Sequence, residues 1–495
     1  MARALSFLAA DLGAESGRVM VGRFDGGRLS LSEAHRFESR PVPLPDGLHT
    51  DVLRIFTEIQ RGLAAGAQSG EELGGVGVDT WGVDFGLLDG GGRLLGNPCH
   101  YRDCLGSGVL ERALARVPRA EIFEATGIQL LELNTLFQLL RLREREAAEL
   151  AAAGRLLMMP DLFSYWLSGR PVNEYTIATT SQCFDTRRGD WARGLLERFS
   201  LPTAIFGEIV PPGTVLGDLR PDLAADAGIA RLPVVAVGGH DTALAVAAVP
   251  ARKGRDFAYV SSGTWSLLGA EIEAPCIGEA SLAANFTNEG GVCGTIRFLK
   301  NLCGLWLVQE CRRGWARGGT ADSYDDLTEM AAAAPPFRSL VDVDHPDFAA
   351  PGDMPARLQV FCRRTGQPVP ETKGEIVRCA LDSLALKYRH VLSTLEGILE
   401  RRLEPLHVVG GGARNRLLCQ LAADATGRAV VAGPVEATAA GNVAMQAMAL
   451  GHLGSKDLAE ARDLVRCSFE IVTYDPRPGA AVDEAYTRLV RVMAP

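Results

Sequence analysis

Short apolar runs alternate along most of the chain with segments in which apolar residues recur every three or four positions. The first pattern predicts buried strands and the second predicts amphipathic helices. Strands that alternate with helices indicate an α/β fold. The apolar run before Asp11 predicts a buried strand rather than a signal peptide, because it is short and no small-residue cleavage pattern follows it.

Two segments about half a chain apart share one pattern: an apolar strand, a turn of small polar residues with glycine, and a second apolar strand. They are residues 9–24 and residues 255–269. Each predicts a hairpin whose tip exposes backbone N–H groups. Together they indicate a duplicated domain with one phosphate-facing tip in each half. Two unrelated hairpins are the alternative.

A chain of 495 residues is too long for one ordinary core, so we expect two domains. Residues 234–250 predict a strand, a Gly-Gly turn and a helix of small residues. We place the domain boundary near the end of this segment, which gives domains 1–247 and 248–495. The Ala-rich segment 141–154 predicts one solvent-facing helix.

Composition and charge limit the classes of ligand that we expect the protein to bind. The net charge of -9, without a basic block, argues against nucleic acid and anionic membranes as ligands. Backbone amides can still bind phosphate without net positive charge. The 11 cysteines are dispersed and form no CxxC pair, which fits a reducing cytoplasm. Cys362 and Cys379 can pair, but we expect reduced thiols.

The first hairpin tip carries groups suited to phosphate. Ser16 and the neighbouring amides can cradle phosphate oxygens, and Arg18 offers charge-assisted donors. Asp11, at the end of the strand, can hold Mg²⁺ through water. A plain glycine turn with a surface aspartate is the alternative.

Two further segments suit a nucleotide. Residues 261–264 place hydroxyls and amides at the second hairpin tip, and a Ser-rich β-turn is the alternative. Residues 410–412 are three glycines between a predicted strand and a helix that starts near Asn415. They remove side chains where a base and ribose can lie against the backbone. The pattern is not GxGxxG, so a dinucleotide site is not favoured.

A candidate acid follows the Gly-Gly turn. A carboxylate at Asp241 can take the proton of an acceptor hydroxyl during phosphoryl transfer, with His240 and Thr242 beside the acceptor. An ordinary helix N-cap is the alternative. Residues 75–89 crowd Trp81 and acids into one turn after a strand, which suits a sugar, and a structural turn is equally plausible.

The order of these segments resembles the FGGY carbohydrate kinases, a branch of the actin-like ATPase superfamily. The segments include DLGAESGRVM, VDTWGVDFGLLD, NEYTIATTS, HDTALAV, SSGTWSLLG, LAANFTNEGG, LKNLCGLWLVQE and VVGGGARN. The resemblance implies two ribonuclease-H-like domains with a catalytic cleft between them. It also implies an enzyme that uses ATP and Mg²⁺ to phosphorylate L-rhamnulose at its 1-hydroxyl in L-rhamnose catabolism.

The resemblance also assigns residues. Asp241 is the expected proton acceptor, while Asp11 is the expected metal ligand on the chemistry of its own hairpin. The residues expected to contact the sugar are Gly82, His240, Asp241, Thr242 and Asn301. Those expected to contact ATP are Ala14, Glu15, Ser16, Gly17, Arg18, Thr264, Gln309 and Gly411.

Spacing and charge bear on three of these positions. Asn301 and Gln309 lie eight residues apart on one predicted helix. This spacing is about two helical turns, so both side chains face the same side of the helix. Glu15 stands where a small polar residue is expected, and an acid there repels phosphate unless it points away or helps to hold Mg²⁺.

Three alternatives remain at this stage. A kinase for another ketose, such as L-fuculose or L-xylulose, would share every motif outside the sugar pocket. A non-enzymatic actin-like ATP-binding module would not need an acid at position 241. A nuclease on the related ribonuclease-H fold is disfavoured by the acidic charge and the glycine triplet. A monomer or a homodimer is expected.

Overall fold

The computed structural model describes residues 5–68, 70–319, 322–455, 457–477 and 479–493. The chain forms two compact units and passes between them more than once. Unit 1 contains Met1–Ala248, Glu271–Phe298 and Ala437–Phe469, and unit 2 contains Val249–Ala270, Leu299–Glu436 and Glu470–Pro495.

A six-stranded sheet in the order β13-β14-β6-β1-β2-β3 forms the centre of unit 1. The β1 strand pairs antiparallel with β2 and parallel with β6, and β6 pairs parallel with β14. The predicted N-terminal strand and first hairpin are therefore confirmed. The strands are β1 (Leu5–Leu12), β2 (Ser16–Phe24), β3 (Leu29–Glu38), β6 (Leu73–Thr80), β13 (Thr214–Asp218) and β14 (Pro233–Ala236).

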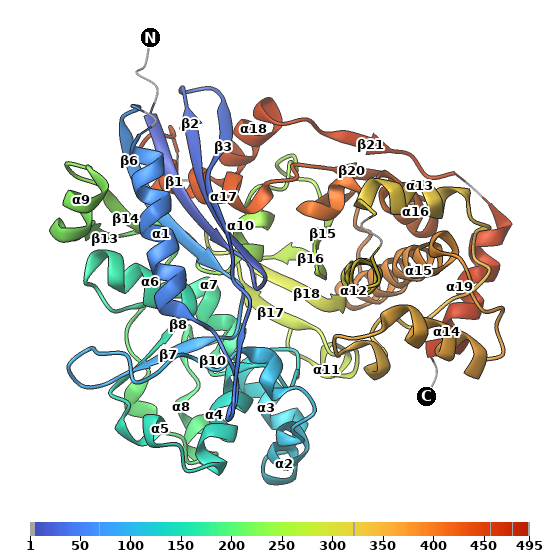
Figure 1. The fold of residues 1–495 in the computed structure, drawn as a ribbon, viewed down its shortest axis with the longest axis horizontal. Coiled ribbons are helices and arrows are strands. Elements are labelled where there is room, and N and C mark those ends of the chain that lie inside the picture. The colour runs from blue at the N-terminus through green and yellow to red at the C-terminus, as the bar shows by residue number, and fades with distance from the viewer. Residues whose placement is uncertain (1–4, 69, 320–321, 456, 478, 494–495) are drawn as a thin grey trace. The chain divides into compact units, whose positions relative to one another are not determined.

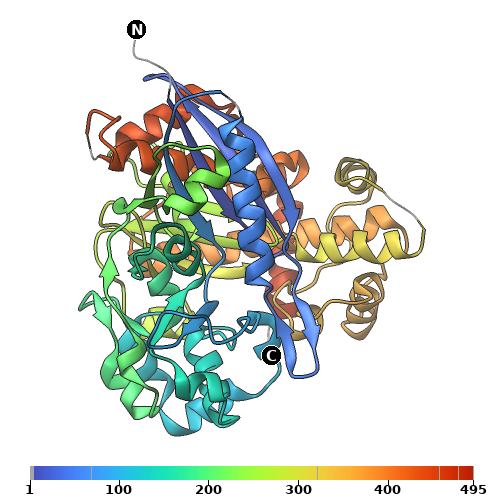
Figure 2. The same ribbon diagram turned by 60° about the vertical axis from the view of Figure 1, so that its left-hand side comes forward.

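Helix α1 (Val52–Ala67) lies along one face of this sheet, as Figures 1 and 2 show. The Asp51 side chain caps its first turn by accepting a backbone N–H. Ile55, Ile59 and Leu63 recur every four residues and are buried in the core against the sheet. The amphipathic pattern thus decides both the helix and the face that it covers.

Helix α17 (Ala437–Ala449) covers the opposite face. Gly62 of α1 packs against Val19, whereas Val443 of α17 packs against Gly22. Positions 19 and 22 point to opposite faces of β2, because side chains alternate along a strand. Unit 1 therefore has helices on both faces of its sheet, and the parallel strands β1 and β6 are buried on both sides.

The strands of unit 2 repeat this order. The sequence β16-β15-β19-β20-β21 matches β2-β1-β6-β14-β13, with a hairpin, two parallel pairings and an antiparallel edge strand in both. The predicted second hairpin and the duplication are confirmed at the level of strand order. The strands are β15 (Ala258–Ser262), β16 (Trp265–Ile272), β19 (Leu406–Val409), β20 (Val430–Ala432) and β21 (Val472–Tyr474).

Long helix α15 (Lys373–Leu399) organises the rest of unit 2. A capping box between Thr372 and Glu375 starts it. The Tyr388 hydroxyl lies 2.6 Å from the Ser266 hydroxyl and ties the helix to the second hairpin. This bond fixes the hairpin from behind its tip.

The remaining elements connect these cores. In unit 1 they are β4 (Val42–Leu44), β5 (Gly47–His49), β7 (Phe85–Leu88), α2 (Val109–Arg116), α3 (Arg119–Thr126), α4 (Thr135–Glu144), α5 (Ala148–Ala152), β8 (Arg155–Met158), α6 (Met159–Ser168), β9 (Asn173–Glu174), α7 (Tyr175–Ala178), β10 (Phe184–Asp185), β11 (Asp190–Trp191), α8 (Arg193–Arg198), β12 (Ile209–Val210), α9 (Pro221–Ala227), α10 (Asp241–Ala247), α11 (Glu279–Ala283), β17 (Thr287–Gly290) and α18 (Leu458–Ser468). In unit 2 they are α12 (Trp306–Arg317), α13 (Tyr324–Ala333), α14 (Met354–Arg364), α16 (Arg416–Thr426) and α19 (Ala480–Met493), while β18 (Ile296–Cys303) begins in unit 1 and ends in unit 2.

The prediction of one helix over residues 141–154 is wrong. Helix α4 ends at Glu144, and α5 covers only Ala148–Ala152. Glu146 between them has a φ of 51°, a left-handed conformation that no α-helix continues through. The expected helix at the end of residues 234–250 is confirmed as α10, and the helix near Asn415 is confirmed as α16 with Asn415 as its N-cap.

Within the described residues, no helix combines the length and the apolar character needed to cross a membrane. Cys362 and Cys379 are both buried and are free thiols in the structure.

Helix α17 approaches α10 so closely that Gly441 tolerates no side chain. A Cβ there would lie 2.1 Å from the Leu244 carbonyl oxygen. We expect Gly441→Ala to lower the free energy of unfolding by about 1–3 kcal/mol, because the backbone of α10 must shift. Gly397→Ala in α15 is the control: a Cβ there meets nothing within 4 Å, and we expect a gain of about 0.5–1 kcal/mol. Urea unfolding measures the stability of both variants. Equal unfolding midpoints for Gly441→Ala and Gly397→Ala would contradict the packing argument.

Candidate active site

Asp241 opens helix α10, directly after the Gly-Gly turn that follows β14. The Thr80 backbone N–H at the end of β6 donates to the Gly239 carbonyl over 2.9 Å, which holds the turn beside the sheet. The half-exposed Asp241 carboxylate accepts through Oδ1 from the Thr242 backbone N–H (2.5 Å) and hydroxyl (3.1 Å). Thr242 therefore orients the candidate base.

A buried carboxylate holds the same turn from the other side. Glu174 Oε2 accepts from the backbone N–H of Gly239 over 2.7 Å and from the Thr176 hydroxyl over 2.6 Å. The Thr176 oxygen in turn accepts from the backbone N–H of His240 over 3.2 Å. Two side chains thus fix two successive peptides immediately before Asp241.

Asp161 of α6 lies behind this clamp, where its Oδ1 accepts the Glu174 backbone N–H over 3.0 Å. Burial and the negative charge of Glu174 raise the pKa of Asp161 well above its usual value. Four donors converge on Glu174 Oε2, including the backbone N–H groups of Thr176 and Ile177. Burial raises the pKa of Glu174 as well, but these four donors oppose that rise by stabilising its carboxylate form.

Gly82 borders the same place. A Cβ at Gly82 would lie 3.4 Å from the Thr180 side chain and 3.5 Å from His240 Nε2. The His240 ring is buried, with Nε2 3.4 Å from Asp241 Oδ1. The structure thus brings four of the five predicted sugar residues together in unit 1: Gly82, His240, Asp241 and Thr242.

Carboxylates gather at the strand ends of unit 1. Asp11 and Asp79 are register partners on β1 and β6, and Arg18 Nη2 lies 2.6 Å from Asp11 Oδ2. Asn442 Nδ2 donates to Asp79 Oδ2 over 2.7 Å. Burial and the charges of Asp11 and Asp241 raise the pKa of Asp79 well above its usual value. A divalent cation that takes one or two carboxylates and completes its shell with water and phosphate would relieve the repulsion that raises this pKa.

The tip of the first hairpin is held by a residue that the sequence did not single out. Ser39 donates its hydroxyl to the Gly13 carbonyl over 2.7 Å and its backbone N–H to the Glu15 carbonyl over 3.1 Å. Ser16 is exposed, and Ala14 is half-exposed. These bonds keep the tip in one conformation.

Gly17 has a structural reason to be glycine. A Cβ there would lie 2.3 Å from the Phe37 ring, so the residue allows Phe37 to pack over β2. Arg18 follows it and faces Asp11, as the ion pair shows.

The prediction that Asn301 and Gln309 share a helix is wrong. Asn301 belongs to strand β18, and Gln309 belongs to helix α12. The chain turns at Gly304, where a Cβ would lie 2.6 Å from the Trp265 carbonyl carbon. The close approach of the second hairpin at this point replaces the expected helical turn.

The tip of the second hairpin adjoins the start of α12. The backbone N–H of Gly304 donates to the Thr264 carbonyl over 3.0 Å, and that of Leu305 donates to the Gly263 carbonyl over 2.9 Å. Gln309 lies one turn into the helix, and its Oε1 is buried with no hydrogen-bond partner among the described residues. This buried acceptor is one of several unsatisfied polar atoms among the described residues.

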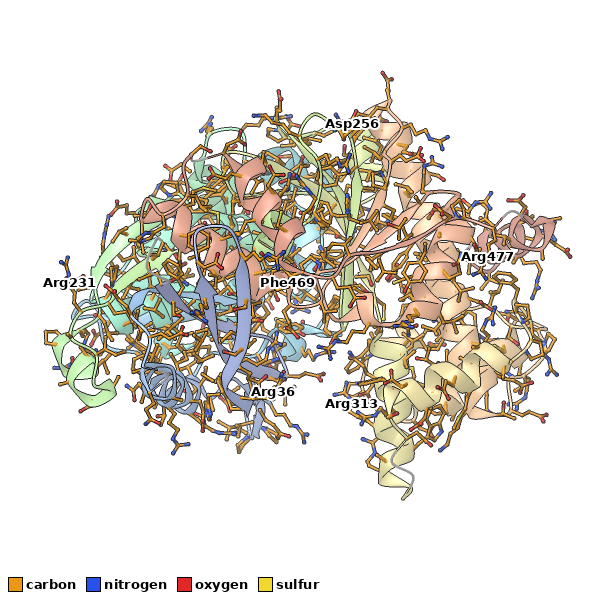
Figure 3. The ribbon with its side chains drawn as sticks, turned by 90° about the horizontal axis from the view of Figure 1, so that it is seen from above. Arg36, Arg231, Asp256, Arg313, Phe469 and Arg477 are labelled. Carbon is orange, nitrogen blue, oxygen red and sulfur yellow. The ribbon has the colours of Figure 1, made fainter. Side chains whose placement is uncertain are left out.

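Helix α12 is held to its own unit by aromatic contacts. Arg313, which Figure 3 labels, lies over the Trp306 ring at 5.0 Å, and Trp306 Nε1 donates to the Phe348 carbonyl over 2.9 Å. Gly411 begins the short helix after β19, and a Cβ there would meet nothing within 4 Å. Its Cα therefore borders open space, as close approach by a ligand requires.

The acids of the predicted sugar turn have a structural role. Asp84 is buried, with Oδ2 accepting from Trp81 Nε1 (2.9 Å) and Oδ1 accepting from Gln138 Nε2 (3.2 Å). Burial raises the pKa of Asp84 from 3.8 to about 7. Val83 between them adopts a φ of 68°, rare for a β-branched residue, and is held by the Thr180 hydroxyl. This bracing holds Gly82 beside His240.

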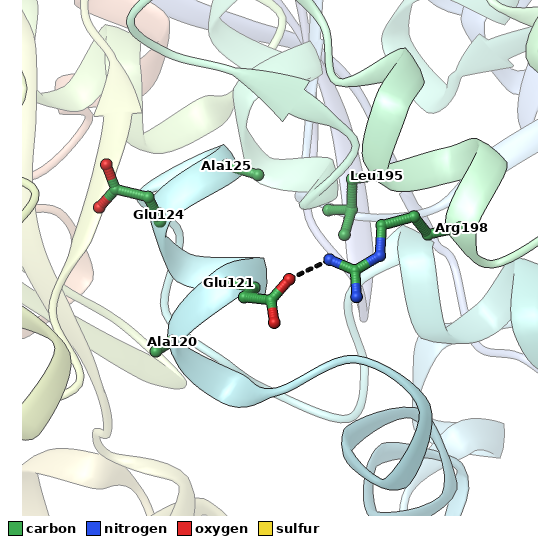
Figure 4. A pocket seen from close by; sticks show the side chains of 6 residues that line it. All are labelled: Ala120, Glu121, Glu124, Ala125, Leu195 and Arg198. Carbon is green, nitrogen blue, oxygen red and sulfur yellow. Dashed lines mark hydrogen bonds and ion pairs between the residues drawn. The ribbon is translucent and has the colours of Figure 1, made fainter.

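One hollow of about 530 Å³ lies elsewhere in unit 1, between α3 and α8. Figure 4 shows Arg198 of α8 reaching across it to Glu121 of α3. None of the predicted site residues lines it. The lining residues are Ala120, Glu121, Glu124, Ala125, Leu195 and Arg198.

Sequence reasoning assigned no role to the residues that hold the site. Glu174 and Thr176 lie in NEYTIATTS, a segment that already supported the family resemblance. Glu174 stands among polar residues in its segment, so its burial, which only the structure shows, is what distinguishes it.

The raised pKa of Asp84 predicts a pH dependence of stability. Between pH 3.8 and about 7 the unfolded chain ionises Asp84 while the folded chain keeps it protonated. Stability therefore falls as the pH rises through this window and levels off above it. In Asp84→Asn this fall should be smaller, as measured by urea unfolding from pH 4 to pH 8. The control, Asp89→Asn, removes an exposed acid whose pKa is lowered, and should keep the wild-type profile in this window. An unchanged profile in Asp84→Asn would contradict the buried acid.

Two family models match the chain. The N-terminal domain of the FGGY family of carbohydrate kinases matches residues 7–248, and the C-terminal domain matches residues 258–450.

Curated proteins and solved structures agree with these matches. A rhamnulokinase from Bacteroides thetaiotaomicron is 47% identical over 97% of this chain and 98% of its own length. A rhamnulokinase from Oceanobacillus iheyensis is 38% identical over 94% of this chain and 97% of its own. The crystal structure of Plasmodium falciparum glycerol kinase with ADP shares the fold, with a TM-score of 0.79 at 13% identity over 100% of this chain and 99% of that one. The chain therefore belongs to the FGGY family of carbohydrate kinases and has its two-domain, actin-like architecture.

Proposed function

We propose that the protein is a rhamnulokinase, which transfers the γ-phosphoryl group of ATP to the 1-hydroxyl of L-rhamnulose in L-rhamnose catabolism. The observation that carries this proposal is the 47% identity to a curated rhamnulokinase over nearly the full length of both chains. The grouping of Gly82, His240, Asp241 and Thr242 in one unit supports it. We expect the reaction to take place in the cytoplasm.

In the proposed reaction, Asp241 accepts the proton of the attacking hydroxyl. Its Oδ1 is already oriented by Thr242, so the carboxylate needs little rearrangement when the sugar binds. The backbone clamp from Glu174 fixes the turn that carries it. Gly82 leaves room for the sugar beside His240, and we propose Asn301 of unit 2 as a further contact.

We propose that the residues that contact ATP are Ala14, Glu15, Ser16, Gly17, Arg18, Thr264, Gln309 and Gly411. The open space over Gly411 and the buried Oε1 of Gln309 support two of these assignments. Mg²⁺ would be held near Asp11, where it would neutralise phosphate charge and offset the repulsion with Asp79. At Asp11, the ion competes with the Arg18 pair.

The choice of L-rhamnulose over other ketoses needs a test of its own. L-Fuculose and L-xylulose differ from L-rhamnulose in hydroxyl stereochemistry or chain length, and only a small set of pocket contacts separates them. The test is ADP release with Mg-ATP against L-rhamnulose, L-fuculose, L-xylulose, D-xylulose and glycerol. We expect the highest kcat/KM with L-rhamnulose.

Asp241→Asn should lower kcat by about 10²-fold or more, because a general base contributes about 10²–10⁴-fold. The variant should fold, since an asparagine oxygen can still accept from Thr242. The matched control is Asp218→Asn, an exposed carboxylate on β13 that pairs with Arg231, and it should keep full activity. Turnover of another ketose alone would overturn the assignment of L-rhamnulose as the substrate. Turnover of no sugar, with ATP still bound, would overturn the enzymatic function and favour an ATP-binding module.

A further inference from the structure

The His240 ring is held from behind by a buried arginine. Arg297 of β18 is fully buried, and its Nη2 lies 3.0 Å from His240 Nδ1. Its Nε donates to the Gly290 carbonyl over 2.8 Å, and its Nη1 lies 3.2 Å from Glu289 Oε2. Each of the three guanidinium nitrogens therefore contacts a different residue of unit 1.

This contact determines which nitrogen of His240 carries the proton. A guanidinium has only N–H donors and does not deprotonate in proteins, so the ring nitrogen that it faces must offer a lone pair. A proton on Nδ1 would point at the hydrogens of Arg297. A lone pair on Nδ1 leaves Nε2 as the ring nitrogen that carries the proton.

The carboxylate of Glu289 compensates the positive charge of the buried Arg297. Its Oε2 lies 3.3 Å from His240 Nδ1 and 3.2 Å from Arg297 Nη1. The competing arrangement would place a proton on Nδ1 and donate it to this carboxylate. Arg297 opposes that arrangement because it occupies the same lone pair and already neutralises Glu289.

The Nε2 proton faces the candidate site. Nε2 lies 3.4 Å from Asp241 Oδ1, and a Cβ on Gly82 would lie 3.5 Å from it. A donor at Nε2 and an acceptor at Asp241 therefore lie side by side. A sugar presents both kinds of partner on adjacent carbons: a hydroxyl that loses its proton to Asp241 and a neighbouring oxygen that accepts from His240.

We propose that Arg297 is a positioning residue that fixes His240 as the neutral Nε2–H tautomer and so makes it a permanent hydrogen-bond donor to a sugar oxygen next to the attacking hydroxyl. Glu289 balances the charge of Arg297. The sugar contact rests on the proposed function, but the tautomer does not, because it is a property of the free protein.

The tautomer is measured by ¹⁵N NMR of the full chain labelled at histidine, without substrate. The His240 signal is assigned by its loss in His240→Gln. We expect Nδ1 to resonate as an unprotonated nitrogen and Nε2 as an N–H nitrogen at neutral pH. A proton on Nδ1, or on both nitrogens, would overturn the proposal. This measurement uses the wild-type protein, so it does not depend on any variant at Arg297 folding.

A paired variant tests the consequence. Arg297→Met with Glu289→Gln removes the donor and leaves no unpaired buried charge. We expect mixed His240 tautomers and a KM for the ketose raised by about tenfold, the effect of losing one good hydrogen bond, with the KM for ATP unchanged. An unchanged tautomer, or equal changes in both KM values, would contradict a positioning role.

The control removes a comparable buried ion pair elsewhere in unit 1. Arg462 of α18 bonds Glu271 and the carbonyl of Val246, which lies in the last turn of α10, about one turn beyond Asp241 and Thr242. Arg462→Met with Glu271→Gln should destabilise the fold but keep the His240 tautomer and both KM values. If no ketose is phosphorylated by the wild type, the proposed function fails, while the NMR result still decides the tautomer.

Discussion

The position of Asp241 depends on two backbone N–H groups, those of Gly239 and His240, which donate to Glu174 and Thr176. A carboxylate that accepts a proton has to be held within a few tenths of an ångström of its partner. Here the sheet, a buried acid and a hydroxyl fix the peptides before Asp241, and the side chain is then oriented by its own neighbour in α10. The candidate base is thus placed by backbone bonds rather than by packing of its own side chain.

The repeated strand order explains why chemistry collects where it does. In both units, the first strand of the hairpin, β1 or β15, ends in a polar tip. The strand that pairs parallel with it, β6 or β19, ends in a turn with polar side chains or exposed backbone. Unit 1 places Asp11 and Asp79 at these ends and the Gly239 turn after the third strand. Unit 2 places Thr264 and Gly411 at the equivalent ends. One architecture, used twice, therefore supplies acids in one unit and small residues in the other.

Local pattern predicted the hairpins, the strand before His240 and the helix after it, because strand alternation, glycine turns and N-capping act within a few residues. It failed at Asn301 and Gln309, where contact with a hairpin about 40 residues earlier bends the chain at Gly304. The local sequence also gave no role to Glu174 or Arg297. Both act on the turn around residues 239–240 from 57 to 65 positions away, and such long-range partners leave no periodic signal.

The central proposal is that Gly82 of unit 1 borders the sugar and that Gly411 of unit 2 borders the nucleotide. Gly82→Ala and Gly411→Ala test it, because a Cβ fits at each position without a clash in the free protein. The account predicts that Gly82→Ala raises the KM for the ketose alone and that Gly411→Ala raises the KM for ATP alone. Equal effects of either substitution on both KM values, or no effect on either, would contradict it.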